Sequence, residues 1–81
     1  MSAPRLQLLT RKGCHLCEVA AGTLAQVAAD AGLEPVAVDV DADPDLQAEY
    51  GDRVPVVLLD GQEHSYFTVD VVRLRQDLGL T

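Results

Sequence analysis

Large aromatic side chains are scarce in this chain of 81 residues, which has no tryptophan, one phenylalanine and two tyrosines. Its core must therefore be built from leucine, valine and alanine, and the apolar share of 48% is sufficient for a single small core. No stretch approaches the roughly 18 apolar residues that a membrane-spanning helix needs. We expect one globular domain over residues 1–81, with no membrane as a partner.

Positive charge is also scarce, because six lysine and arginine residues face 13 acidic ones and the formal net charge is −7. A nucleic-acid-binding domain normally carries a basic face, so nucleic acid is not an expected partner. The first residues lack the long apolar segment of a secretory signal peptide. These features predict a cytoplasmic protein, which we expect to be a monomer.

Cysteine occurs only twice, as Cys14 and Cys17 in the stretch TRKGCHLCEVA of residues 10–20. A disulfide that closes so short a loop constrains the unfolded chain very little, and structural disulfides are rare in reducing compartments. A zinc site would need two more ligands, yet there is no second C-x-x-C and His15 is poorly placed between the cysteines. A redox pair is the favoured interpretation, and no bound metal is expected. A metal or iron–sulfur site shared between two copies of the chain is the alternative that this reasoning leaves open.

The first half of the chain predicts a strand, a helix and a second strand. An apolar run over 5–10 indicates a buried strand, three- and four-residue spacing indicates a helix over 17–31 that ends at Gly32, and β-branched residues indicate a strand over 35–40. Two strands joined by a helix should be parallel. The apolar face of the helix comprises Cys17, Ala20, Ala21, Leu24, Val27, Ala28 and Ala31.

The second half predicts a short helix capped by Asp43, a strand over 56–60, a turn at Asp60-Gly61 and a return strand over 62–67. Thr68 is predicted to cap a last helix. The resulting order βαβαββα predicts an α/β fold with a four-stranded mixed sheet flanked by three helices. The apolar positions expected in the last helix are Val69, Val72 and Leu78.

The two cysteines should differ in exposure. Cys14 precedes the helix and can face solvent, whereas Cys17 shares the buried face of its first turn. A helix N-terminus favours an anion and lowers the pKa of a thiol placed there. Cys14 is therefore the candidate nucleophile and Cys17 the resolving cysteine. Arg11, Lys12 and a protonated His15 would add positive charge beside the thiolate, although His15 is equally well explained as an exposed spacer.

Val54-Pro55 stands at the start of a strand that should be central in the sheet. Proline cannot donate a hydrogen bond within a sheet, so it belongs at the first position of such a strand. Only about 5–6% of bonds to proline in folded proteins are cis, so frequency alone predicts a trans bond here.

The segments TRKGCHLC and RVPVVLLDG, with the order of the elements, resemble the glutaredoxin branch of the thioredoxin superfamily and, within it, small proteins with a C-x-L-C centre. The resemblance covers essentially the whole chain. It implies a minimal thioredoxin fold with strand order 2-1-3-4. It also implies that Cys14 attacks and Cys17 resolves, that Lys12 is the basic residue before the nucleophile, that Pro55 is a cis-proline facing the disulfide, and that the backbone of Val54 pairs with a bound peptide or thiol.

Three features depart from the family pattern. His15-Leu16 replaces the usual residues between the cysteines, residues 6–9 contain no buried acid, and SYFTVD stands where glutaredoxins usually have two glycines and an acid. Thr68 and Asp70 are the residues that could replace that motif. The expected binding residues for a thiol substrate are Lys12, Arg53, Val54, Thr68 and Asp70.

The expected function is thiol–disulfide exchange in electron transport. The substrate would be a disulfide-containing protein or a small thiol, and electrons would come from glutathione, another small thiol or a reductase. No cofactor is expected to be bound. The alternative is a redox sensor or binding module that uses the same fold without turnover. No role is assigned to His64.

Overall fold

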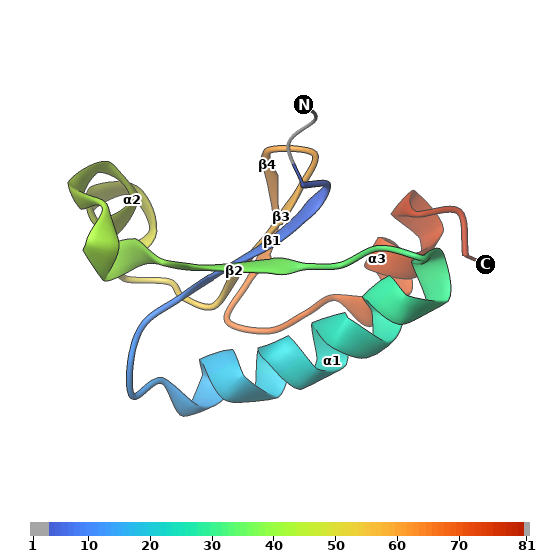
Figure 1. Ribbon diagram of the computed structural model, residues 1–81, viewed down its shortest axis with the longest axis horizontal. Helices are drawn as coiled ribbons and strands as arrows, with labels where there is room; N and C mark the ends of the chain where they lie inside the picture. Colours follow the sequence, from blue (N-terminus) through green and yellow to red (C-terminus); the bar gives the residue numbers. More distant parts are fainter. Residues whose placement is uncertain (1–3, 81) are drawn as a thin grey trace.

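The computed structural model describes residues 4–80 of the chain (Figure 1). Within these residues, three α-helices and four strands follow one another in the predicted order, with one short 3₁₀ helix between the second strand and the second α-helix. The elements are β1 (Leu6–Thr10), α1 (His15–Ala31), β2 (Val36–Asp39), the 3₁₀ helix η1 (Val40–Ala42), α2 (Pro44–Tyr50), β3 (Val56–Leu59), β4 (Gln62–Tyr66) and α3 (Val71–Asp77).

The strands form one mixed sheet in the order β2-β1-β3-β4. β1 and β2 are parallel, whereas β3 runs antiparallel to both β1 and β4. This arrangement confirms the predicted topology and the predicted strand order. Because Leu9 of β1 lies opposite Val56 of β3, the end of β1 and the beginning of β3 meet at the same end of the sheet.

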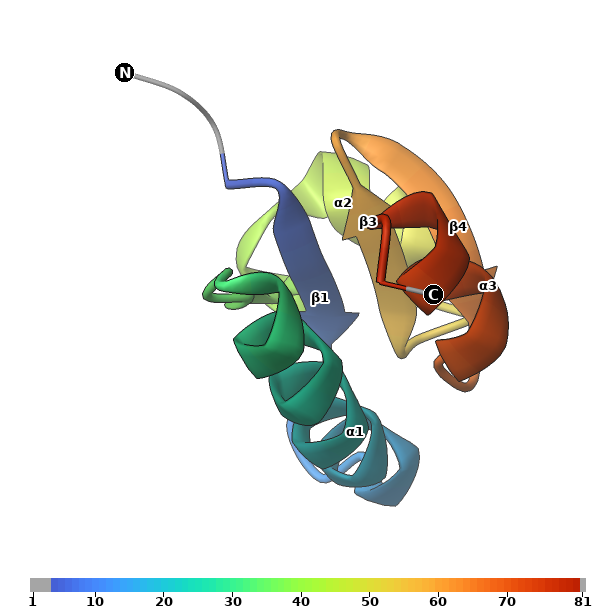
Figure 2. The ribbon, with the colours of Figure 1, turned by 90° about the vertical axis from the view of Figure 1, so that its right-hand side faces the viewer.

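The two faces of the sheet are covered by different helices. Consecutive residues of a strand point to opposite faces, and Leu8 packs in the cluster with α1 and α3 while Leu9 packs in the cluster beside α2. α2 and α3 lie at opposite ends of the molecule in Figure 1, and Figure 2 is seen from the α3 end with α2 as the more distant helix. Among residues 4–80, no helix is long and apolar enough to span a membrane.

Helix α1 positions the cysteines. It begins at His15, two residues earlier than predicted, because Cys14 already acts as its N-cap; Gly32 ends it with a φ of 70°. The buried residues are Cys17, Ala20, Leu24, Val27 and Ala28, whereas Ala21 is exposed and Ala31 is half-buried.

The beginning of α3 differs from the sequence-based expectation. Asp70, not Thr68, caps this helix, because its carboxylate accepts a hydrogen bond from the Arg73 backbone N–H at 3.2 Å. Val72 was expected on the apolar side, yet 71% of it is exposed. The buried residue of this helix is Leu74 instead.

The short helices and the hairpin follow local signals. Asp43 caps α2 by accepting hydrogen bonds from the backbone N–H groups of Asp45 and Leu46, as predicted for the cap. Asp60 and Gly61 both have positive φ, which is typical of the tight hairpin turn expected there. The 3₁₀ helix η1 was not predicted; it follows β2 where Asp39 accepts a hydrogen bond from the Asp41 backbone N–H.

His64 has a structural position that the sequence did not indicate. The pairing of β3 with β4 shifts register between Val57 and Leu58, and His64 lies at this irregularity. Only 7% of its side chain is exposed, and its Nε2 lies 2.7 Å from a carboxylate oxygen of Asp77. His64 therefore ties β4 to α3.

Candidate redox site

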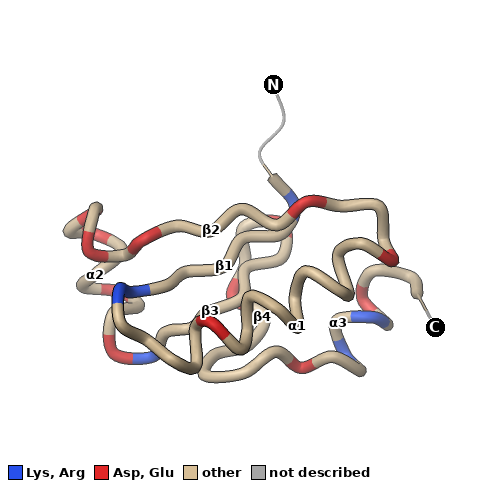
Figure 3. Tube along the Cα trace, turned by 60° about the horizontal axis from the view of Figure 1, so that its bottom comes forward, with Lys and Arg blue, Asp and Glu red and all other residues tan. Residues whose placement is uncertain are grey.

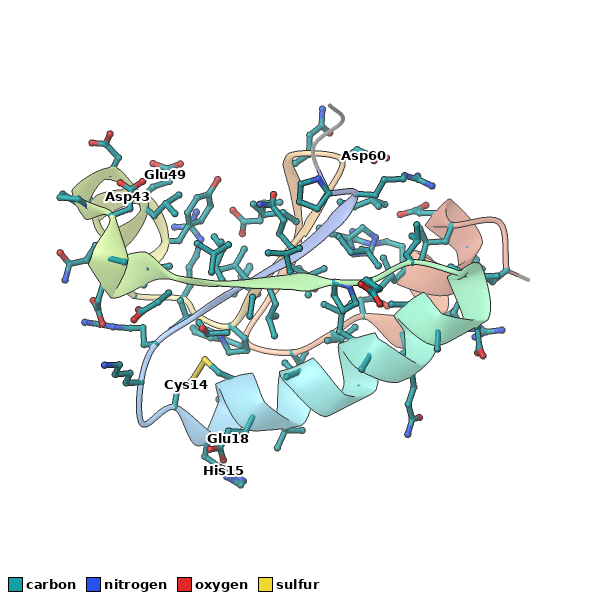
Figure 4. All side chains as sticks on the ribbon, in the orientation of Figure 1. Cys14, His15, Glu18, Asp43, Glu49 and Asp60 are labelled. Atoms are coloured by element: carbon teal, nitrogen blue, oxygen red, sulfur yellow. A yellow bond between two sulfur atoms is a disulfide. The ribbon has the colours of Figure 1, made fainter. Side chains whose placement is uncertain are left out.

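Cys14 and Cys17 form a disulfide at the junction of β1 and α1 (Figure 4). Their Cα atoms are 5.2 Å apart, within the usual range for disulfide-linked residues. Cys14 is half-buried, whereas only 4% of Cys17 is exposed. The structure thus brings the two sulfurs together and leaves Cys14 as the more accessible residue of the pair.

The start of α1 contacts the sulfur of Cys14 directly. The backbone N–H of Cys17 donates a hydrogen bond to Cys14 Sγ at 3.1 Å, so Cys14 occupies the N-cap position of the helix. The first N–H groups of a helix have no partner within the helix, and they favour negative charge. An N–H group is therefore already directed at the sulfur that would carry the charge after reduction.

A pocket of about 270 Å³ opens beside the disulfide. It lies between the loop that follows β1 and the first turns of α1. Its lining combines both cysteines with two cations and one acid, and consists of Thr10, Arg11, Lys12, Gly13, Cys14, Cys17, Glu18 and Ala21.

Arg11 and Lys12 differ in their surroundings, although both were predicted to add positive charge beside Cys14. Figure 3 shows Lys and Arg in blue where the chain leaves β1. The Arg11 guanidinium forms an ion pair with Asp41, with 3.0 Å between Nη2 and Oδ1, and donates a hydrogen bond to the Gly51 carbonyl at 3.2 Å. Lys12 makes no ion pair with any residue of 4–80. The uncompensated positive charge at the pocket therefore belongs to Lys12.

His15 is strongly exposed and does not line the pocket. Its Nδ1 lies 3.9 Å from a carboxylate oxygen of Glu18, and 85% of its side chain is accessible. Figure 4 shows His15 on the side of the helix start away from the sulfurs. This placement favours the interpretation of His15 as an exposed residue between the cysteines.

The Val54–Pro55 peptide bond is cis, so the expectation of a trans bond from frequency alone is wrong. Pro55 is buried directly before β3, and its carbonyl accepts a hydrogen bond from the Phe67 N–H at 2.7 Å. Since Val56 lies opposite Leu9, Pro55 is at the same end of the sheet as Thr10, which lines the pocket.

The other residues expected to bind a thiol do not line the pocket. Arg53 forms an ion pair with Glu63 at 2.9 Å, donates a hydrogen bond to the Glu49 carbonyl and lies 5.1 Å from the ring centroid of Tyr50. Asp70 caps α3 and Thr68 is exposed before that helix. None of these three is in the pocket lining, and neither is Val54.

Sequence reasoning missed several residues around the cysteines. Thr10, Glu18 and Ala21 line the pocket, and their proximity to Cys14 along the chain was a usable signal. Asp41 and Gly51 reach the site only through Arg11, from 30 and 40 residues away. No local pattern connects such distant positions.

Metal-ligating side chains do not gather in the part of the chain that the structure describes. Within residues 4–80, no group of three or more histidine, cysteine, aspartate or glutamate residues is arranged to hold an ion.

A family model described as Glutaredoxin-like domain (DUF836) matches residues 5–79, which include both cysteines and Pro55. The chain belongs to this glutaredoxin-like family. An uncharacterized protein of Mycobacterium tuberculosis strain H37Rv is 49% identical to this glutaredoxin-like protein over 83 residues, covering 96% of this chain and 86% of the relative.

Solved structures show the same architecture. The solution structure of the protein Ne2328 from Nitrosomonas europaea is 26% identical, with a TM-score of 0.79, and the alignment covers 95% of this chain and 94% of that one. A thioredoxin variant from Halobacterium salinarum is 23% identical, with a TM-score of 0.60, and the alignment covers 90% of this chain and 69% of that one. This match shows that the two proteins share a fold. The glutaredoxin-like protein thus has a thioredoxin fold, with its disulfide-forming cysteine pair where the loop after β1 passes into α1.

Proposed function

We propose that this glutaredoxin-like protein is a thiol–disulfide oxidoreductase that works by dithiol exchange. The observation that carries the proposal is the unequal exposure of two cysteines that reach bonding contact, with the more accessible one at the N-cap of α1. A structural disulfide would need neither the difference in exposure nor the N–H group directed at Cys14.

The reduced protein starts with two thiols and the substrate with one disulfide. Deprotonated Cys14 attacks one substrate sulfur, so a mixed disulfide forms and the other substrate sulfur leaves as a thiolate. Deprotonated Cys17 then attacks Cys14 Sγ, which releases the second substrate thiolate and forms the Cys14–Cys17 disulfide. The substrate gains two electrons and, after protonation, becomes two thiols, while the protein is oxidised to the form in the structure.

Two features support Cys14 as the nucleophile. The N–H of Cys17 and the N-terminus of α1 favour a negative sulfur, so the pKa of the Cys14 thiol in the reduced protein should lie below the ordinary value of about 8.5. Lys12 adds a positive charge that no acid within residues 4–80 compensates through an ion pair.

The substrate that we propose is a disulfide in a protein or in a small thiol. Its reacting sulfur would lie at Cys14, and its backbone or thiol moiety would lie along Val54 before the cis bond to Pro55. Of the five predicted binding residues, Lys12 lines the pocket and remains a candidate. Val54 does not line it, and it remains a candidate because it directly precedes the cis bond to Pro55. Arg53 and Asp70 are engaged in contacts elsewhere, and Thr68 lies outside the pocket.

Electrons would return to the disulfide from glutathione, another small thiol or a reductase. Two molecules of a monothiol supply the two electrons and leave as their own disulfide. A reducing compartment such as the cytoplasm would keep the pair available for the next exchange, and we propose that the protein acts there as a monomer.

The test is turnover of a protein disulfide, with insulin as the model substrate and glutathione or dithiothreitol as the reductant. The variant with both cysteines changed to serine is the blank. We expect repeated turnover above that blank with at least one reductant. If Cys14 and Cys17 were oxidised once per molecule, without turnover under either reductant, the proposal of an oxidoreductase would be overturned and a redox sensor favoured.

A further inference from the structure

Three segments that are distant in the sequence meet at the end of the sheet where Thr10 and Pro55 lie and where β1 leads into the loop of Cys14. We call this the redox end of the sheet. The loop after β1 carries Cys14, η1 follows β2, and the segment after α2 leads from Gly51 to Pro55. Arg11 belongs to the first of these segments and its side chain contacts the other two. Its guanidinium is the only side chain in residues 4–80 for which hydrogen bonds join all three.

The contacts of Arg11 use the full shape of the guanidinium. Nε donates to Asp41 Oδ2 at 3.1 Å and Nη2 approaches Asp41 Oδ1 at 3.0 Å, which is a two-point contact with one carboxylate. Nη1 donates to the Gly51 carbonyl at 3.2 Å. A planar group with several fixed donors can hold both acceptors at once, which the ammonium of a lysine cannot reproduce.

Both acceptors are held in place by α2. The Gln47 side-chain amide donates to Asp41 Oδ1 at 3.0 Å, and the Gly51 N–H donates to the Gln47 carbonyl at 2.9 Å. Gly51 is buried, and a Cβ at this position would lie 2.5 Å from the same carbonyl oxygen. Arg11 therefore attaches the cysteine loop to groups that are themselves held by the helix.

We propose that Arg11 is a positioning residue, which holds the loop carrying Cys14 in register with the segment that leads to Val54 and Pro55. Arg11 lies three residues before Cys14, and Gly51 lies four residues before Pro55. Because Asp41 compensates the charge of Arg11, electrostatic support of the Cys14 thiolate comes from Lys12. This inference rests on the proposed exchange function, since alignment matters when a substrate contacts both segments.

The two roles of Arg11, alignment and charge, are separated by comparing two reactions of the reduced protein. Reduction of insulin requires a substrate aligned with both segments, whereas alkylation of Cys14 by iodoacetamide requires only a reactive thiolate. We expect Arg11→Gln to slow insulin reduction by about tenfold to a hundredfold while the alkylation rate stays within about twofold. A parallel loss of both rates would show that Arg11 acts through its charge, and would overturn the proposal.

Two further variants test the geometry. Arg11→Lys keeps the charge but not the two-point contact, so we expect it to lose as much insulin reduction as Arg11→Gln. Asp41→Asn should lose activity as well. The double variant that combines Asp41→Asn with Arg11→Gln should be no slower than Arg11→Gln alone, because the two substitutions break the same contact. Normal turnover by Arg11→Lys, or additive losses in the double variant, would contradict the proposal.

The matched control is Arg75→Gln, which breaks an ion pair to Asp30 at 2.8 Å remote from the disulfide. Its side chain is exposed to a similar extent, 36% against 41% for Arg11. We expect this variant to keep both rates. An equal loss of insulin reduction in Arg75→Gln would show a general effect of removing surface ion pairs, and would overturn the positioning role.

Amide hydrogen exchange tests the contact without depending on activity. If wild-type protein reduces no insulin, the proposed function fails, and the role of Arg11 in holding the segment is then decided by exchange. The N–H groups of Gly51 and Arg53 bond to the carbonyls of Gln47 and Tyr50. Faster exchange at these two amides in Arg11→Gln, but not in Arg75→Gln, would support the proposal that Arg11 holds this segment in place. Unchanged exchange in Arg11→Gln would overturn that proposal.

Discussion

Two arginines flank β1 and form the same contact at opposite ends of the strand. Arg5 places two nitrogens 2.9 and 3.0 Å from the Asp60 carboxylate, and Arg11 places two nitrogens 3.1 and 3.0 Å from that of Asp41. All four side chains are partly exposed. Judged only by their chemistry and accessibility, the two ion pairs should contribute equally to the structure.

Their surroundings make them different. The Asp60 N–H also donates to the Arg5 carbonyl at 2.8 Å, so the backbone already joins the residues that the ion pair joins. Arg11 instead reaches η1 and the end of α2, and it adds the Gly51 carbonyl as a second acceptor besides the Asp41 carboxylate. An exposed ion pair contributes little free energy, but it can determine where a loop lies when it connects segments outside the sheet.

The largest expected effect lies at the redox end and concerns activity. Cys14→Ser removes the nucleophile, so we expect insulin reduction to fall by about a thousandfold or more. The free energy of unfolding of the reduced protein should change by less than about 0.5 kcal/mol, because Cys14 is half-buried and serine is similar in size. The measurements are insulin turnover and urea unfolding under reducing conditions.

Cys17→Ser is the matched variant for this prediction. It keeps the attacking sulfur and lacks the resolving one, so a mixed disulfide between Cys14 and the substrate should accumulate and be visible by mass spectrometry. A stable adduct at Cys17 in Cys14→Ser, with none in Cys17→Ser, would reverse the assigned roles.

A smaller effect is expected when a methyl group is added at Gly51. Its Cβ would lie 2.5 Å from the Gln47 carbonyl oxygen, so α2 or the following segment must shift. We expect Gly51→Ala to lower the free energy of unfolding by about 1–3 kcal/mol, measured by urea unfolding, and to slow insulin reduction.

The control for Gly51→Ala is the same substitution at Gly22, an exposed position in α1 where a Cβ meets nothing within 4 Å. Alanine there should raise the free energy of unfolding by about 0.5–1 kcal/mol, since glycine in a helix interior is unfavourable. If both alanine variants changed the free energy of unfolding by the same amount and in the same direction, the close packing at Gly51 would not distinguish the redox end from the rest of the molecule.

Lys12→Gln should have a modest effect that is confined to the thiolate. A nearby cation favours the deprotonated sulfur, so its removal should raise the pKa of the Cys14 thiol by less than about one unit. Thiolate absorbance at 240 nm against pH measures this change. Lys12→Arg should preserve the wild-type pKa, and a Lys12→Gln titration identical to wild type would assign the electrostatic support to the helix alone.

The smallest effect is expected at the opposite end, in Asp60→Asn. The hydrogen bond from Arg5, with its charge, holds the pKa of Asp60 below its ordinary value of 3.8. A lowered folded-state pKa contributes stability above the unfolded-state pKa, and this contribution is lost as pH falls through the folded-state value. Asparagine tolerates the φ of 52° at this turn, so the substitution mainly removes the charge.

We therefore expect Asp60→Asn to have a slightly lower Tm than wild type at pH 7, and the two Tm values to converge at acidic pH once Asp60 is protonated. Thermal unfolding followed across the acidic range measures this convergence. A Tm difference that persists unchanged at the lowest pH would point to the turn geometry rather than to the ion pair. Insulin turnover at pH 7 should be unaffected, in contrast to Arg11→Gln.

Local patterns predicted most of the fold because the interactions behind them are short-range. The helix over α1, its end at Gly32 and the cap at Asp43 depend on residues within a few positions of one another. The start of α3 could not be predicted in this way. Thr68 and Asp70 are both suitable caps by residue type, and packing of Leu74 into the core accompanies the choice of Asp70.

The sequence by itself determined that a cysteine pair lies where a strand passes into a helix, because strand and helix periodicity place Cys14 before the first turn and Cys17 on its buried side. Only the tertiary structure decided which cation remains free beside the sulfurs. Asp41 and Gly51 engage Arg11 from 30 and 40 residues away, while Lys12 pairs with no acid in residues 4–80. The physical reason is range, since helix and strand signals act between near neighbours, whereas compensation of a charge depends on whatever the folded chain brings within about 4 Å.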